Sequence, residues 1–75
     1  MKATLEFNLP EERGEHLIAV HAMDFALAAF DLDEELRRWL KYGNEFKSVD
    51  EALDAARQKL HECLRAHEVS TDMIT

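Results

Sequence analysis

The chain has 75 residues, with 16 acidic and 9 basic side chains, and apolar residues make up 47% of it. This apolar fraction excludes an intrinsically disordered chain, and the net charge of -7 argues against general binding of DNA or RNA, which requires a basic face. Cys63 is the only cysteine, which excludes a disulfide scaffold, and every uncharged stretch is far shorter than the roughly 20 residues of a membrane-spanning helix.

The small size of the chain predicts a single domain over residues 1–75 that is completed by self-association. One core in so short a chain offsets the conformational entropy of folding only narrowly, and no disulfide can help. We therefore expect a homodimer. The lone cysteine suits a reducing compartment, and the residues after Met1 and Lys2 lack the apolar run of a secretory signal.

The first nine residues alternate between apolar and polar side chains. This period of two predicts a short β-strand, or an extended arm, over residues 1–9. A lone strand must pair with a symmetry mate, with the C-terminal tail or with a partner protein, because its backbone groups are otherwise unsatisfied. Leu5 and Phe7 are the residues that we expect at such a pairing or dimer contact.

Residues 10–42 have a helical pattern that begins with Pro10, a residue suited to the first turn of a helix. From residue 17 to about residue 32 the segment is apolar nearly all round, which is typical of a helix sandwiched between neighbours. The apolar stripe shifts near residues 21–24, which fits either one long helix or two. We favour a break, with helices over about 10–21 and 23–42. Gly43, directly after the second of these helices, is the expected stop signal.

A third helix is predicted over residues 48–67. Ser48 and Glu51 have the spacing of a capping box, in which each side chain bonds the backbone of the other residue. A short polar tail over residues 69–75 follows. The predicted fold class is therefore mainly α, a small helical bundle with a strand or arm at its N-terminus. Its expected core contains Phe7, Leu17, Val20, Leu27, Phe30, Leu32, Leu36, Trp39, Leu53, Leu60 and Leu64.

The negative charge is concentrated in the first half of the chain. Residues 1–35 contain two basic and nine acidic side chains, whereas residues 36–75 contain seven of each. The densest acidic group is Asp31, Asp33, Glu34 and Glu35. One interpretation is a solvated face that keeps the chain in solution. The other is a negative surface that steers the protein onto a basic partner.

Aromatic and basic residues gather at the end of the second predicted helix and in the loop after it. The candidates are Arg38, Trp39, Lys41, Tyr42 and Phe46. In one interpretation Trp39 fills the core and Tyr42 and Phe46 cover its edge. In the other, these residues form a binding patch, because aromatic residues and arginine are enriched at interface hot spots.

The residues offer little support for catalysis, and we expect neither an enzyme nor a cofactor. Two isolated glycines cannot form a phosphate-binding loop, and no pair of carboxylates stands out from the many present. Cys63 and His67 are four residues apart on the third helix and supply two ligands of a zinc site at most. We therefore interpret them as a buried thiol beside a boundary histidine, with the metal site as a weak alternative.

Several segments carry a resemblance to a known family. They are residues 2–12, residues 36–43, residues 50–53, and residues 59–62 with Leu64. Over nearly the whole chain, these segments resemble an uncharacterised family of small acidic proteins from tailed bacteriophages. The resemblance implies a phage origin and a location in the cytoplasm of the bacterial host, and it carries no catalytic motif. Similar proteins have a small-residue turn where this chain has His21 and Ala22, which implies a helix break there.

We therefore expect a small phage-type accessory protein that binds a host or phage protein and modulates or inhibits it. The acidic face and the aromatic-basic patch would make the contacts. One alternative is an acidic mimic of DNA that blocks a nucleic-acid-binding complex of the host. The other is a structural protein that assembles with copies of itself. Neither a membrane nor direct nucleic-acid binding is expected.

Overall fold

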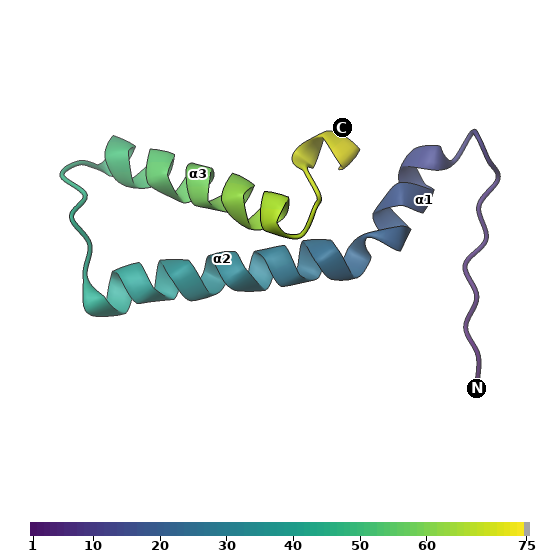
Figure 1. Cartoon of the computed structure of the whole chain (residues 1–75), viewed down its shortest axis with the longest axis horizontal. Helices are drawn as coiled ribbons and strands as arrows, with labels where there is room; N and C mark the ends of the chain where they lie inside the picture. Colours follow the sequence, from purple (N-terminus) through teal and green to yellow (C-terminus); the bar gives the residue numbers. More distant parts are fainter. Residues whose placement is uncertain (75) are drawn as a thin grey trace.

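The computed structural model describes residues 1–74 and is mainly helical (Figure 1). Three α-helices, α1 (Arg13–Val20), α2 (Ala22–Tyr42) and α3 (Val49–Ala66), are followed by a short 3-10 helix, η1 (Thr71–Ile74). Among these described residues there is no β-strand, and residues 1–8 form an arm without regular secondary structure. The predicted helical class is confirmed. The strand is not supported, because the C-terminal tail folds into η1 against α1 instead of pairing with the arm.

The helical segment breaks at His21, so the choice between one helix and two is settled in favour of two. α1 ends at Val20, α2 begins at Ala22, and the two helices are inclined to each other (Figure 1). The His21 ring lies 3.0 Å from a carboxylate oxygen of Asp24, measured from Nδ1. This contact ties the junction to the first turn of α2.

The turn between α2 and α3 follows the predicted stop and start signals. Gly43 has a φ of +94°, a conformation that L side chains rarely adopt, and α2 ends directly before it. At the start of α3, the Ser48 hydroxyl accepts a hydrogen bond from the Glu51 backbone N–H at 3.1 Å. The reciprocal half of the capping box is wrong, because the Glu51 carboxylate accepts from the Lys47 N–H at 3.2 Å and not from Ser48.

α2 and α3 form an antiparallel hairpin whose core lies near the end of α3 (Figure 1). Its fully packed members are small or medium-sized: Ala28, Cys63, Leu64 and Val69. Phe25, Leu32, Leu60 and Met73 are partly buried against them. Val69 enters the core because the chain turns back after α3, with its N–H bonded to the Leu64 carbonyl at 3.0 Å.

The predicted core is wrong for four of its eleven residues, and six others are only half-buried. Of the expected core residues, Leu64 alone is buried; Val20, Leu27, Phe30 and Leu53 are exposed. The physical reason is the shape of the molecule, which measures 49 × 29 × 17 Å. Its shortest dimension holds a single layer of helices, so each helix has one side without a neighbour.

The molecule is also far from spherical. Its radius of gyration is 16.3 Å, whereas a compact domain of this length has about 11 Å. In the described part of the chain, no helix is both long enough and apolar enough to cross a membrane.

Candidate protein-binding surface

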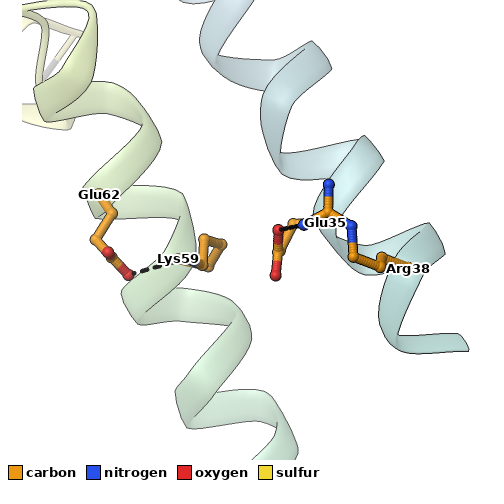
Figure 2. A network of polar contacts seen from close by, with 4 residues as sticks. All are labelled: Glu35, Arg38, Lys59 and Glu62. Atoms are coloured by element: carbon orange, nitrogen blue, oxygen red, sulfur yellow. Dashed lines mark hydrogen bonds and ion pairs between the residues drawn. The ribbon is translucent and has the colours of Figure 1, made fainter. Parts of the chain in front are cut away.

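Most carboxylates of the predicted acidic face pair with side chains of the same chain. Asp31 bonds the His67 ring at 2.7 Å, between a carboxylate oxygen and Nε2, and so links α2 to the end of α3. Glu35 pairs with Arg38 at 2.6 Å (Figure 2), and Glu34 lies 3.7 Å from Arg37. Three of the four carboxylates thus have a positive or protonatable partner within the chain, which reduces the charge they offer to another molecule.

The fourth carboxylate, Asp33, does not share a side of α2 with Asp31 or Glu35. Successive residues of a helix are separated by about 100°, so Asp33 is turned about 200° from each of them. The four acidic residues therefore surround α2 instead of forming one face. α3 has a similar local pair, between Lys59 and Glu62 at 3.4 Å (Figure 2).

The predicted aromatic-basic patch separates into two parts. Trp39 and Phe46 pack edge to face with ring centroids 5.1 Å apart, and both are half-buried at the loop end of the hairpin. This part agrees with the interpretation in which Phe46 covers Trp39. The stack holds the loop against α2, and the Asn44 amide donates to the Trp39 carbonyl at 3.3 Å.

The second part of the patch is open to solvent. We call it the basic hollow, a shallow depression lined by Glu34, Arg37, Arg38, Lys41 and Tyr42. The Lys41 ammonium lies 5.5 Å from the centre of the Tyr42 ring, and the Tyr42 side chain is exposed. Exposed aromatic, arginine and lysine side chains around a depression can take up a carboxylate-bearing segment of a protein.

Sequence reasoning missed an apolar strip on the surface, because it placed Val20, Leu27 and Phe30 in the core. We call it the outer strip. Its members are Val20, Met23, Leu27 and Phe30, which are 61%, 69%, 43% and 61% exposed. They recur every three or four residues along α1 and α2 and lie away from α3. The sequence signal was the apolar character of residues 17–32 nearly all round the helix, but only the fold shows that no segment within residues 1–74 covers this side.

The arm adjoins the outer strip. Phe7 packs against the His16 ring with centroids 5.4 Å apart, whereas Leu5 remains 77% exposed. Arm and α1 together form an open groove lined by Leu5, Phe7, Leu9, His16, Ala19 and Val20. The groove and the strip meet at Val20, so the two form one continuous apolar region.

Cys63, in α3, and His67, directly after α3, both make contacts within the fold. Cys63 is buried, and burial, with a smaller effect from the Asp31 charge, raises the pKa of its thiol. His67 is bonded to Asp31. No group of three or more potential metal-ligating side chains occurs among residues 1–74. Comparison of the chain with known protein families, with curated proteins and with solved structures finds no match.

Proposed function

We propose that this chain is a non-enzymatic accessory protein that acts by binding another protein. The observation that carries the proposal is the large accessible surface of the chain. The accessible area is 6412 Å², whereas a compact monomer of 8.7 kDa exposes about 4,700 Å². The exposed apolar side chains of the outer strip and the arm groove form one continuous part of this surface, and such an apolar patch on a small domain marks an interaction site.

The basic hollow would provide the polar contacts of such a complex. Interfaces combine an apolar centre with polar and charged residues at the rim, and Arg38 and Tyr42 belong to the residue types enriched at hot spots. The acidic cluster gives less support to a DNA mimic, because Asp31, Glu34 and Glu35 already pair within the chain.

The biological setting rests on the resemblance to small phage proteins. The resemblance implies a location in the cytoplasm of an infected bacterium, where the partner would be a host or phage protein that the chain modulates or inhibits. The assembly of copies of this chain remains a second candidate, favoured by the outer strip.

A comparative pull-down tests the proposal. The tagged protein is incubated with bacterial lysate, with and without phage infection, and washed at low and high salt. The hollow variant carries Arg38→Ala and Tyr42→Ala, and a control variant carries Arg57→Ala at an exposed site on α3. We expect one stoichiometric protein with the wild type and the control, and a clear loss with the hollow variant. Recovery of the bait alone, or of the same proteins by all three chains, contradicts the proposal.

A further inference from the structure

The junction between α1 and α2 differs little from a continuous helix. Residues 15–42 contain neither glycine nor proline, the residues at which helices most often bend. The His21 N–H donates to the Leu17 carbonyl and the Phe25 N–H donates to the His21 carbonyl, both at 3.0 Å, so hydrogen bonds of the helical kind lie on either side. His21 itself has φ -100° and ψ 13°, against about -63° and -42° in a regular helix. A change of conformation at this one residue would bring the two helices into line.

The C-terminal segment holds α1 away from that straight course. Figure 1 shows α1 inclined from the axis of α2 toward the side on which α3 and η1 lie. η1 packs on α1, and Ile18 of α1 lines one shallow depression together with Met73 and Ile74 of η1. Met73 is also packed against the buried core of the hairpin, so η1 ties α1 to α2 and α3. Since α1 has no fully buried residue of its own, its angle depends on these few contacts.

The turn after α3 directs the segment toward α1. The Glu68 N–H donates to the Arg65 carbonyl and the Val69 N–H donates to the Leu64 carbonyl, both at 3.0 Å. These are the two hydrogen bonds of a Schellman motif, in which a residue of left-handed conformation follows the helix. Glu68 has that conformation, with a φ of +60°. Val69 is buried and anchors the start of the segment, so residues 70–74 can leave α1 while Val69 stays in the core.

We propose that residues 70–74 act as a latch that keeps α1 bent at His21, and that release of the latch lets α1 and α2 join into one straight helix. Residues 13–42 then form a helix about 45 Å long. Ile18 leaves Met73 in this step, and the His21 backbone takes regular helical values.

Straightening would change the shape of the apolar surface. At 100° per residue, a continuous helix places five side chains within about 80° of one another: His16, Val20, Met23, Leu27 and Phe30. The arm groove on α1 and the outer strip would then share one straight face. A partner that binds this face competes with the latch, because it stabilises one of the two conformations. This consequence rests on the proposed function, whereas the latch itself does not.

Two alanine substitutions on α1 test the latch as a matched pair. Ile18→Ala removes a side chain that lines the depression with η1, whereas Val20→Ala removes one from the outer strip. Both replace a β-branched residue with the best helix former, so intrinsic helix propensity changes in the same direction. We expect Ile18→Ala to shift the ratio of straight to bent chains about threefold to tenfold toward the straight form, because apolar contact with η1 is lost. Val20→Ala should change this ratio much less.

The distance between two spin labels measures the ratio. Labels at Arg13→Cys and Leu40→Cys, both at exposed positions, would lie about 40 Å apart along a straight helix and closer together in the bent chain. Chains without the two introduced cysteines control for Cys63, which is buried and should react slowly. The ¹³Cα chemical shift of His21 in the unlabelled chain gives an independent readout and should move toward the helical value.

Met73→Asp tests the same contact from the side of the latch. A charge in this apolar contact should release α1 more completely than Ile18→Ala does. Leu53→Asp, at an exposed leucine of α3, is its matched control and should leave the bend intact. Circular dichroism shows whether the hairpin stays folded; if Met73→Asp unfolds it, Ile18→Ala, which lies outside the core, decides the question.

The outcomes that overturn the latch are specific. A label distance that stays short in Ile18→Ala, or one that lengthens equally in Ile18→Ala and Val20→Ala, refutes it. These measurements use the isolated chain, so their failure leaves the proposed function standing. A pull-down that captures no target refutes the proposed function, whatever the label distances show.

Discussion

The two sides of α2 carry similar residues in different environments. On the side toward α3, Ala28 is completely buried and Phe25 and Leu32 pack around it. On the opposite side, Leu27 and Phe30 are exposed within the same two turns of helix. The difference arises because α3 packs on one side of α2 (Figure 1), whereas no segment within residues 1–74 covers the other side. An apolar stripe thus shows that a side of a helix favours burial, without showing whether its own chain provides the cover.

The largest expected difference between the two sides of α2 is in the free energy of unfolding when an aspartate replaces one of two neighbouring alanines. Ala28→Asp buries an unpaired carboxylate against Cys63 and Leu64 and should cost about 3–5 kcal/mol, which approaches the total stability of a domain this small. Ala29→Asp, at an exposed position, should cost less than about 1 kcal/mol. Urea unfolding followed by circular dichroism measures both. Equal losses would show that the two sides of α2 do not differ in packing.

Replacing a buried or an exposed leucine with alanine should give a smaller difference in the free energy of unfolding. Leu64→Ala opens a cavity in the core and should lower the free energy of unfolding by about 2–4 kcal/mol. Leu27→Ala should cost less than about 1 kcal/mol when the chain is dilute and monomeric. Repeating the measurement at increasing protein concentration sharpens the comparison, since a second copy on the outer strip makes the cost of Leu27→Ala grow. A cost that does not vary with concentration contradicts the dimer.

The hydrogen bond between Asp31 and His67 belongs to the covered side and should have a modest effect. It joins α2 to the end of α3, but both side chains are partly exposed, so water screens it. We expect a coupling of about 0.5–1 kcal/mol in a double-mutant cycle with Asp31→Asn and His67→Gln. A coupling of zero would mean that apolar packing alone holds the two helices together.

The smallest expected effect is the alkaline loss of stability due to Cys63. Burial raises the pKa of its thiol above the ordinary value of 9.0, so the folded chain holds the proton more tightly than the unfolded chain does. The resulting stabilisation is complete below pH 9.0 and decreases as the pH rises through the higher pKa of the folded chain. Thermal unfolding on either side of pH 9.0 should show this decrease in the wild type and a weaker one in Cys63→Ala. An identical decrease in both chains would assign it to other groups.

Local signals in the sequence predicted the helices well. The break near His21, the stop at Gly43 and the cap at Ser48 each depend on a few neighbouring residues, and each is found at or beside its predicted position. These features are local because backbone conformation and capping act over one or two turns.

The candidate site was predicted less completely. The sequence singled out Arg38, Lys41 and Tyr42, which do line one hollow, but grouped them with Trp39 and Phe46, which pack on each other. It assigned Val20, Leu27 and Phe30 of the outer strip to the core. No local signal in the sequence distinguishes an apolar residue that is buried by its own chain from one that stays exposed and can bind another molecule.

The sequence by itself determined a mainly helical chain, most of its helix ends and the residues with a preference for burial. The start of the first helix was predicted wrongly, because α1 begins at Arg13 and Pro10 lies in the turn before it. The tertiary structure decided which of those residues are buried, that Val69 returns to the core, and that Asp31 is bonded to His67. Helix formation and capping depend on nearby residues, whereas burial depends on which distant segments meet. In this chain α3 packs on α2 and η1 packs on α1, and these contacts are too few to cover every apolar side of the helices.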